Sequence, residues 1–346
     1  MLNQELFNGL PFLVKPENVV RYEDNKVAIL DRRVYPFKRE FVVCSSYQEV
    51  AQAIKDMVTQ SGAPPYAVAY AMTLAAHTVK DRSCTQQLAY MKDAAKALGT
   101  ARPTNNTILY LADRMLKKAT DTINEGGDLE AAMLEMAEQE YIDSYADSQY
   151  MGRIAASLLH DGDCVLNHCW AETTIVYTML EAIKMGKKIT AICSETRPYL
   201  QGARLTSDAI SETGIPTTVI CDNMVAQAMS QGKINAFISG ADRVTMSGHV
   251  INKVGTMQAA LCAHHFDLPY YCFSHKPDFN AKSAKDVEIE YRNPEDSLYC
   301  LGMRTATANV SGYYPAFDVT PPSLVSLIIT NKGAFSPYDI LSYYSD

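Results

Sequence analysis

The chain has 346 residues, of which 47% are hydrophobic and 20% charged, so we expect two globular domains and no disorder. The formal net charge of −8 argues against nucleic acid as a partner, because its phosphate backbone would be repelled. Residues 1–16 lack a signal-peptide pattern and no apolar run is long enough for a membrane span, so no membrane partner is expected. The nine cysteines form no C-x-x-C pair, which favours the reducing cytoplasm over disulfides or structural zinc.

The first 150 residues are predicted to form a mostly helical domain with a short β element. Residues 19–22 and 26–30 read as the two strands of a hairpin. Helical spacing of apolar residues then predicts helices over about 50–58, 66–79, 84–98, from about 102 onward, and 129–159. The sequence allows a kink or break in the last of these helices near Ser148 or Gly152.

Residues 151–346 are predicted to form a second domain, in which strands alternate with helices. The expected strands are residues 164–167, 188–193, 217–220, 236–239 and 270–273. This alternation is typical of a Rossmann-like, doubly wound parallel sheet with helices on both faces. Residues 281–296 are polar and predict a surface excursion, and residues 324–329 read as an apolar helix.

Cys169 lies where the first strand of this domain gives way to a helix. A helix N-terminus favours anions and lowers the pKa of a nearby thiol, so Cys169 is a candidate reactive group. The alternative is a cysteine that only packs in the core. Because strand ends of a parallel sheet meet at one edge, further polar side chains are expected beside it. They are Asp242, Gln201, Asn252, Lys253, Arg197 and Arg204.

This mixture of groups suits acid–base chemistry on a small anionic substrate. A thiol and a carboxylate on opposite sides of a carbon can move a proton between neighbouring carbons. Lys253, near a predicted helix start, suits a phosphate. The chain lacks the glycine-rich motifs for nucleoside triphosphates and dinucleotides, and no metal-ligand spacing is present. Structural alternatives remain open: Asp242 could cap a helix, the arginines could form surface ion pairs, and Asn252-Lys253 could simply start a helix.

Several segments resemble the methylthioribose-1-phosphate isomerases, which group with ribose-1,5-bisphosphate isomerases and the regulatory subunits of the initiation factor 2B superfamily. The run from Glu195 to Leu205 and the pair Asn252-Lys253 resemble the isomerases in particular. The resemblance spans almost the whole chain. Its segments are residues 30–33, 62–64, 102–104, 196–206, 222–224, 240–243, 252–256 and 315–321.

The resemblance implies a helical N-terminal domain with a β start, a Rossmann-like catalytic domain and a homodimer. It also implies an aldose–ketose isomerase of methionine salvage, which acts on a sugar 1-phosphate without metal or organic cofactor. Cys169 and Asp242 match the acid–base pair, with Asp242 exchanging a proton at the ring oxygen or a hydroxyl and Cys169 as thiolate taking the C2 proton. A hydride shift is the competing account. The positions that match substrate contacts are Gly62, Ala63, Arg102, Gln201, Asn252 and Lys253.

Three departures from the family pattern bear on substrate binding. Ser61 replaces an arginine, and Trp170 and Glu172 replace an asparagine and a glycine. Each lost charge-assisted contact should weaken phosphate binding by roughly 1–3 kcal/mol. Trp170 could stack on the sugar or pack in the core, and Glu172 could face solvent in the first helical turn. We therefore expect a sugar 1-phosphate that is not necessarily 5-methylthioribose 1-phosphate, such as a related (5-deoxy)ribose phosphate.

Two non-enzymatic alternatives stay open at this point. The chain could be a regulatory subunit that senses a sugar phosphate without turnover, although a scaffold has no need for the full set of site residues. A nucleic-acid-linked translation subunit is the weaker alternative, because the chain is acidic and has no basic tail.

Overall fold

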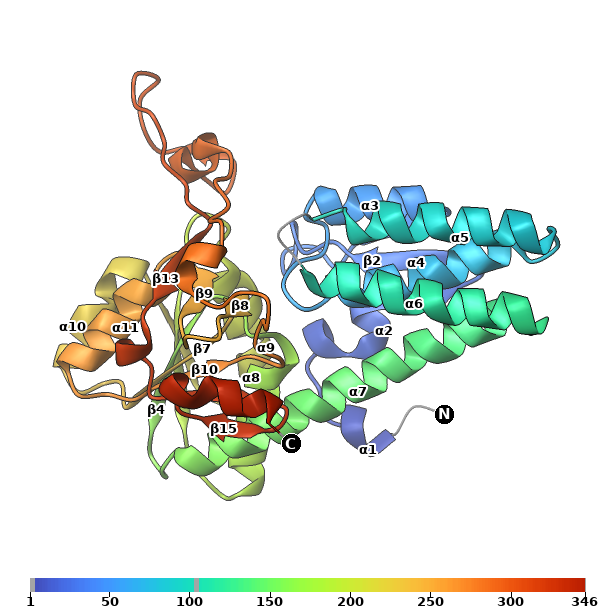
Figure 1. Cartoon of the computed structure of the whole chain (residues 1–346). Helices are drawn as coiled ribbons and strands as arrows, with labels where there is room; N and C mark the ends of the chain where they lie inside the picture. Colours follow the sequence, from blue (N-terminus) through green and yellow to red (C-terminus); the bar gives the residue numbers. More distant parts are fainter. Residues whose placement is uncertain (1–3, 103–105, 346) are drawn as a thin grey trace. The chain divides into compact units, whose positions relative to one another are not determined.

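The computed structural model describes residues 4–102 and 106–345 (Figure 1). The chain divides into two compact units, residues 1–146 and 147–346. This division falls inside helix α7 (Leu129–Leu158). The expected fold class is confirmed, because a mostly helical N-terminal region is followed by an α/β region around a mostly parallel sheet.

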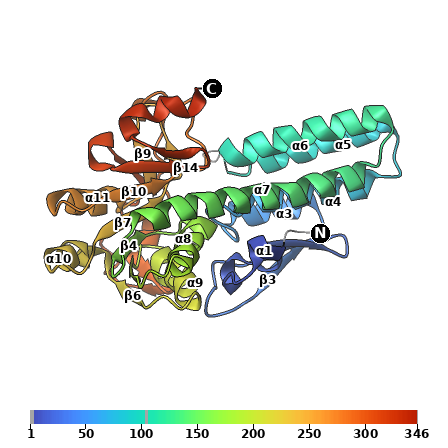
Figure 2. The same cartoon turned by 90° about the horizontal axis from the view of Figure 1, so that it is seen from below.

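The first unit is a small antiparallel sheet packed with helices. The predicted hairpin forms as β1 (Val20–Glu23) and β2 (Lys26–Leu30), and a third strand, β3 (Phe41–Cys44), pairs with β2. Helices α5 and α6 run side by side (Figure 2). The predicted start of α6 near Pro103 and Thr104 lies outside the described residues. The helices are α1 (Gln4–Phe7), α2 (Pro16–Val19), α3 (Tyr47–Lys55), α4 (Pro64–Val79), α5 (Cys84–Gly99) and α6 (Asn106–Glu125).

Helix α7 continues without a break through Ser148 and Gly152, where the sequence allowed a kink. Both residues instead fit α7 against α8 (Glu172–Lys184). A Cβ on Gly152 would lie 2.7 Å from Cβ of Tyr177, so glycine permits the close approach of the two helices. The hydroxyls of Thr173 and Thr174 donate to Oγ of Ser148 at 3.1 and 3.3 Å. The two residues therefore serve packing between helices.

The second unit is built on a seven-stranded sheet in the order β15-β14-β10-β7-β4-β5-β6. All pairs are parallel except β14 with β15. Order along the sheet reverses between β4 and β7, which is the switch point where doubly wound proteins bind ligands. The strands are β4 (Cys164–His168), β5 (Thr190–Ser194), β6 (Thr217–Ile220), β7 (Ala236–Gly240), β10 (Tyr270–Phe273), β14 (Leu327–Thr330) and β15 (Gly333–Phe335).

The five strands predicted for this unit are confirmed to within two residues, but the helix predicted over residues 324–329 is wrong. That segment is the end of a 3-10 turn, η6 (Pro322–Leu324), followed by β14. A short apolar run has no periodicity that separates a buried strand from a buried helix. Ile328 and Ile329 are both fully buried, as expected for a strand covered on both faces.

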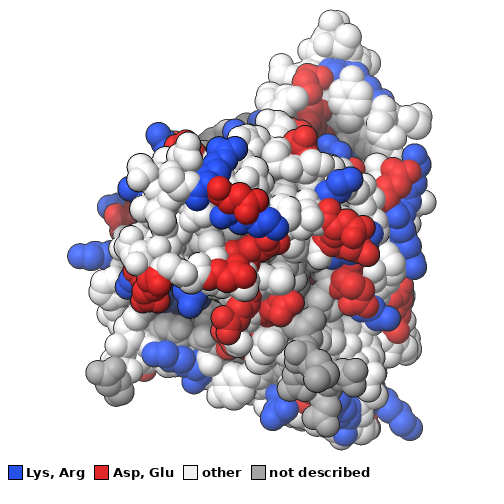
Figure 3. Space-filling model, turned by 90° about the vertical axis from the view of Figure 1, so that its right-hand side faces the viewer, with Lys and Arg blue, Asp and Glu red and all other residues white. Residues whose placement is uncertain are grey.

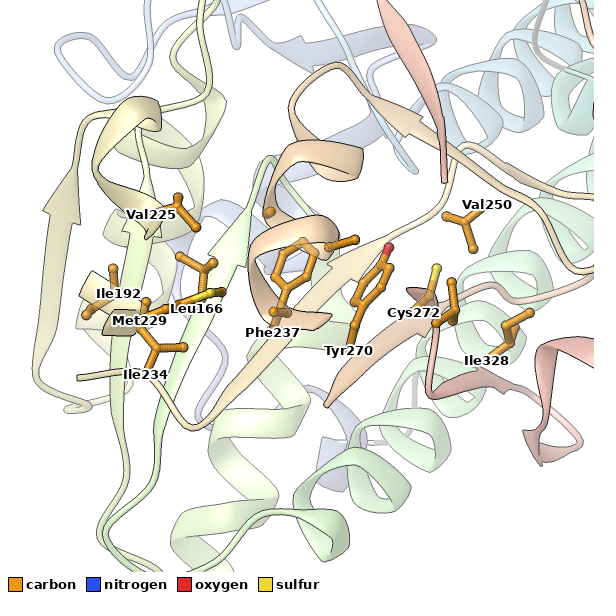
Figure 4. Packing of buried hydrophobic residues seen from close by; sticks show 14 of the residues in the cluster. Leu166, Ile192, Val225, Met229, Ile234, Phe237, Val250, Tyr270, Cys272 and Ile328 are labelled. Carbon is orange, nitrogen blue, oxygen red and sulfur yellow. The ribbon is translucent and has the colours of Figure 1, made fainter. Parts of the chain in front are cut away.

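The core of the second unit lies between the sheet and two of its helices (Figure 4). Phe237 of β7 and Tyr270 of β10 stack with their ring centroids 4.4 Å apart. Helices α10 (Val225–Ser230) and α11 (Thr256–His265) cover this face, and α8 and α9 (Ser207–Glu212) lie on the other (Figure 2). This two-sided cover buries the central strands and leaves their carboxyl ends as the edge for a site.

A second, smaller sheet joins β8 (Arg243–Val244), β9 (Val250–Lys253) and β13 (Phe317–Thr320) in the order β13-β9-β8. Asn252 and Lys253 therefore end a buried strand, whereas the sequence allowed them to start a helix. That helix, α11, begins at Thr256.

Residues 290–316 form an arm that extends away from the sheet and is orange to red in Figure 1. The predicted surface excursion, residues 281–296, covers only its first part. Two backbone bonds close its base, from Ala316 N to Glu290 O (2.8 Å) and from Arg292 N to Tyr314 O (3.1 Å). The arm therefore continues the small sheet that carries Lys253.

The described helices include none that is both long and apolar enough to cross a bilayer. On the described part of the face in Figure 3, acidic and basic side chains are interspersed, so that face offers no continuous basic surface.

Candidate active site at the sheet switch point

Cys169 directly follows β4, at the switch point of the sheet. Its backbone N–H donates to Oγ1 of Thr196, which follows β5, at 2.9 Å. Its carbonyl accepts a short hydrogen bond from the hydroxyl of Thr206, in the π-helical turn η2 (Gly202–Thr206). The loop after β5 thus fixes the backbone of the cysteine on both sides.

Four residues other than glycine at this edge have left-handed backbone conformations. They are Cys169 (φ 62°), Glu172 (φ 53°), Thr196 (φ 63°) and Leu200 (φ 59°). Such a conformation costs roughly 1–2 kcal/mol for an L-residue, and it persists where the surrounding structure enforces it. The concentration of strain in the loops after β4 and β5 is typical of a functional site.

His168 connects the end of β4 to the start of α11. Its Nε2 donates to the carbonyl of Val254 at 3.0 Å, so its Nδ1 must accept from the hydroxyl of Ser194 at 2.7 Å. Burial lowers the pKa of His168, which keeps the ring neutral. A Cβ on Gly255, whose φ is 103°, would lie 2.8 Å from the imidazole. His168 therefore holds the segments of Cys169 and Lys253 together, a structural role that the sequence did not reveal.

The pKa of Cys169 is raised to about 11, first by burial of the thiol. The charge of Lys253, the backbone N–H of Trp170 and the charge of Arg292 lower this pKa by less, and the charge of Asp242 raises it. The lowered pKa expected from the helix N-terminus is therefore wrong in direction, because desolvation outweighs it. The thiol is protonated at neutral pH, and it lies within electrostatic reach of Lys253 and Asp242.

Asp242 follows β7, the strand on the other side of the switch point. Its backbone N–H donates to the carbonyl of Ile251 in β9 at 2.9 Å, so it lies in the connection to β8 and not at the start of a helix. The structure thus brings the predicted thiol and carboxylate together at adjacent strand ends.

Lys253 is buried at the end of β9. Its Nζ donates to Oη of Tyr314 and lies 5.1 and 4.6 Å from the ring centroids of Tyr199 and Tyr314. Burial lowers its pKa to about 8. Arg292, at the base of the arm, is paired with Glu290 at 2.8 Å and also acts on the charge of Cys169. Arg292 and Tyr314 were not predicted as site residues, because the arm carried no motif that the sequence analysis used.

Two buried polar atoms at this edge have no hydrogen-bond partner among the described residues. They are Nε1 of Trp170 and Oε1 of Gln201, and each side chain is only 5% exposed. Three similar atoms lie elsewhere, in Thr59, Gln60 and Thr320. A buried unpaired donor or acceptor costs about 1–3 kcal/mol, so these two atoms are suited to contact a ligand.

The arginines predicted at this edge hold the loop after β5. The guanidinium of Arg197 donates to the carbonyls of Ser297 (3.3 Å) and Tyr299 (2.7 Å) in the arm, and that of Arg204 donates to the carbonyl of Tyr199 (2.9 Å). The carboxylate of Asp222 accepts from the backbone N–H groups of Thr196 and Arg197, both at 2.8 Å. These hydrogen bonds therefore order the loop after β5.

The N-terminus of α11, which we expected to help Lys253 hold a phosphate, is already capped within the protein. The carboxylate of Asp318 in β13 accepts from the backbone N–H of Gly255 at 2.7 Å and from that of Met257 at 3.1 Å. The side-chain amide of Asn252 donates a hydrogen bond to the hydroxyl of Thr256 at 2.9 Å. Two of the backbone N–H groups at the start of α11 are therefore already paired with a carboxylate.

The remaining predicted positions lie in the first unit. Ser61 (φ 57°), Gly62 and Ala63 form the turn before α4, where Ala63 occupies the N-cap. Arg102 is half-buried in the segment before α6. Among the described residues, no group of three or more His, Cys, Asp or Glu side chains is placed to hold a metal ion.

We predict that Gly202→Ala disrupts the site edge. A Cβ at this position would lie 1.8 Å from the carbonyl oxygen of Ser194, which is backbone and cannot move aside cheaply. The unfolding free energy should fall by about 3 kcal/mol, as for an overpacked core. Thermal unfolding measures it. Gly127→Ala is the control, since its nearest new contact is the methyl group of Thr122 at 3.1 Å. Equal melting temperatures of the two variants would contradict the prediction.

Fold and site together define a doubly wound α/β protein with a thiol, a carboxylate and a buried lysine at its switch point, preceded in the sequence by a helical region. Residues 59–337 match the model of the initiation factor 2 subunit family. The chain belongs to this family.

Named relatives and solved structures extend the comparison. Methylthioribose-1-phosphate isomerases from Thermosipho africanus and Fervidobacterium nodosum are each 37% identical, over 92% of this chain and 95% of theirs. The crystal structure of 5-methylthioribose 1-phosphate isomerase from Pyrococcus horikoshii matches with a TM-score of 0.84 and 30% identity, over 98% of this chain and 97% of that one. The crystal structure of subunit delta of translation initiation factor eIF-2B from A. fulgidus matches with a TM-score of 0.81 and 31% identity, over 94% of this chain and 98% of that one. The predicted resemblance is confirmed.

Proposed function

We propose that the protein is an aldose–ketose isomerase of a sugar 1-phosphate, either 5-methylthioribose 1-phosphate or a related ribose phosphate. The main support for this proposal is the proximity of Cys169 and Asp242 at the switch point of the sheet. In addition, relatives that match this chain over almost their full length are named as such isomerases. A cytoplasmic homodimer is proposed from the resemblance alone, and sedimentation would test the dimer.

In the proposed reaction, Asp242 exchanges a proton at the ring oxygen, which breaks the ring that the 1-phosphate keeps closed. Cys169 then removes the C2 proton and returns it to C1, while the C2 hydroxyl gives its proton to the carboxylate of Asp242, so that C1 is reduced and C2 oxidised. A hydride shift from C2 to C1 gives the same product. The pKa of the buried Cys169 thiol is about 11, so the thiol is protonated at neutral pH. Proton transfer by Cys169 therefore requires that another group first accept the thiol proton.

The proposed substrate contacts are of two kinds. Oε1 of Gln201 can accept from a sugar hydroxyl and Nε1 of Trp170 can donate to a sugar oxygen, which would satisfy both buried atoms. Lys253 supplies a positive charge for the phosphate, and Asn252 lies beside it. Five further substrate positions are proposed from the resemblance alone. They are Gly62, Ala63, Arg102, Ser61 and Glu172.

The test is a panel of sugar 1-phosphates, with and without a 5-phosphate or a 5-thioether, incubated with the protein without added metal. We expect one member to be converted to its ketose, measured by NMR of the carbonyl product. Binding in a thermal-shift assay without any turnover across the panel would overturn the proposal in favour of a sugar-phosphate sensor.

We predict that Trp170→Phe raises KM about tenfold, the effect of losing roughly one hydrogen bond to substrate. The ring remains, but the Nε1 donor is gone. Because that donor has no partner among the described residues, the melting temperature of the free protein should not fall through lost hydrogen bonding. Steady-state kinetics measures KM. Tyr343→Phe, which removes a hydroxyl bonded to Asn331 at 2.9 Å, serves as control. An unchanged KM would show that Trp170 only packs.

A further inference from the structure

The backbone of Cys169 is held by two threonine hydroxyls. Cys169 has a left-handed conformation (φ 62°), its N–H donates to Oγ1 of Thr196, and its carbonyl accepts from the hydroxyl of Thr206. The backbone of a residue sets the direction of its Cβ and limits its rotamers. These two bonds therefore act on the position of the thiol through the peptide groups on either side of it.

Thr196 presents its acceptor atom in one direction only. The residue is fully buried, and its hydroxyl donates to the carbonyl of Ser194 at 3.1 Å. A hydroxyl has a single proton, so this bond turns a lone pair of Oγ1 to the N–H of Cys169, 2.9 Å away. The orientation of the Thr196 side chain therefore decides where the Cys169 peptide can lie.

Asp222, which lies just after β6, holds Thr196 in turn. One carboxylate oxygen accepts from the backbone N–H of Thr196 and the other from that of Arg197, both at 2.8 Å. Thr196 has a φ of 63°, which is rare for a β-branched residue because its Cβ substituents crowd the backbone there. Hydrogen bonds to a carboxylate are stronger than bonds between neutral groups, so Asp222 is suited to hold this conformation.

The three residues follow three adjacent strands of the main sheet. Cys169 follows β4, Thr196 follows β5 and Asp222 follows β6, and the sheet order is β4-β5-β6. The contacts thus lead from the edge of the sheet to its switch point. Asp222 lies two strands away from the thiol and reaches it only through Thr196.

We propose that Asp222 and Thr196 are positioning residues for Cys169. The carboxylate holds the left-handed backbone of Thr196, and the hydroxyl of Thr196 holds the peptide of Cys169, so that the thiol lies where the C2 proton of the substrate is transferred. This inference rests on the proposed function for its purpose. The position of the thiol is nevertheless a property of the free protein and can be measured without substrate.

The central variant is Thr196→Val, which keeps the shape and the β-branching of threonine and removes Oγ1. Alkylation of Cys169 by iodoacetamide is measured at one fixed pH, by mass spectrometry of its peptide, in the full-length protein without substrate. The rate should rise about fivefold, the effect of losing roughly one hydrogen bond that keeps a buried group from opening to solvent. Thr196→Ser keeps the hydroxyl and should retain most of the protection. Asp222→Asn keeps one of two acceptor oxygens and should give a smaller rise.

Thr330→Val is the matched control. Thr330 is also fully buried, and its Oγ1 makes the same two kinds of bond, accepting from the N–H of Lys332 at 3.1 Å and donating to the carbonyl of Gly333 at 3.0 Å. It ends β14, three strands away from β4. Its melting temperature should fall about as much as that of Thr196→Val, while alkylation of Cys169 stays as in the wild type.

Two results would overturn the proposal. One is an unchanged alkylation rate of Cys169 in Thr196→Val. The other is an equal acceleration at Cys193 and Cys272, which are buried in the same sheet, because that would report only a loss of stability. Asp222→Asn tests the next link independently, and an unchanged rate in that variant would remove Asp222 from the positioning role.

Turnover supplies the second measurement. In Thr196→Val kcat should fall by about 10–100-fold, because a small misplacement of a reacting group costs up to about 100-fold. KM should change less, since Lys253, which supplies the charge for the phosphate, lies in β9. Absence of turnover across the panel of sugar phosphates would refute the proposed function and leave the alkylation result standing, so the two failures are distinguishable.

Discussion

Replacing Cys169 by serine is expected to lower kcat by about 10²–10⁴-fold, the usual contribution of one acid–base group. A hydroxyl is far less acidic than a thiol, so it cannot supply the base that takes the C2 proton. Serine keeps nearly the same size, and the backbone bonds to Thr196 and Thr206 do not involve the sulfur atom. The fold should therefore survive, and initial rates of ketose formation at saturating substrate measure the loss.

Cys164→Ser is the matched control for this variant. Cys164 starts the same strand, β4, and is also a partly buried free cysteine, but it lies at the opposite end from the site. Its kcat should stay close to that of the wild type. Full turnover in Cys169→Ser would remove the thiol from the mechanism and leave the hydride shift as the account of the reaction.

The main sheet could be predicted because each central strand is a short apolar run that ends in polar residues, as Cys164 to Asn167 shows. The small sheet could not. β9 ends in Asn252 and Lys253, polar residues that are buried only because β13, far along the chain, pairs with it. Pairing between distant segments decides such a strand, and local periodicity does not record it.

The site divides in the same way. Cys169 and Asp242 could be predicted because strand ends of a parallel sheet converge. Tyr314 and Arg292 could not, because they come from a distant part of the chain, the arm, which is tied to the loop after β5 by the bonds from Arg197 to Ser297 and Tyr299. The expectation that the pKa of Cys169 is lowered was wrong, because the sequence shows the helix start but not how deeply the thiol is buried. Burial is a property of the assembled fold.

The family departures gain a physical meaning in the structure. Glu172 has a φ of 53°, a conformation that glycine adopts freely, and the resemblance places glycine there. The substitution therefore adds backbone strain beside Cys169 as well as a carboxylate. Trp170, one residue after the thiol, has a buried Nε1 that lacks a partner among the described residues. Both changes act directly on the edge that would contact substrate.

Asp242→Asn is expected to act in opposite directions on turnover and on thiol reactivity. Asparagine has nearly the same shape but cannot exchange a proton, so kcat should fall by about 10²–10⁴-fold. The negative charge of Asp242 raises the pKa of Cys169, so its removal should lower that pKa. Iodoacetamide should then alkylate Cys169 faster than in the wild type at the same pH, measured by mass spectrometry.

A fall in turnover together with faster alkylation of Cys169 distinguishes a catalytic carboxylate from a structural one. If Asp242 only supported the fold, its loss would change turnover together with the melting temperature and would expose other cysteines as well. Asp267→Asn, an exposed carboxylate after α11, is the control and should change neither rate. Retained turnover together with faster alkylation would leave Asp242 as an electrostatic neighbour of the thiol, and the proton for the ring oxygen would then have to come from another group.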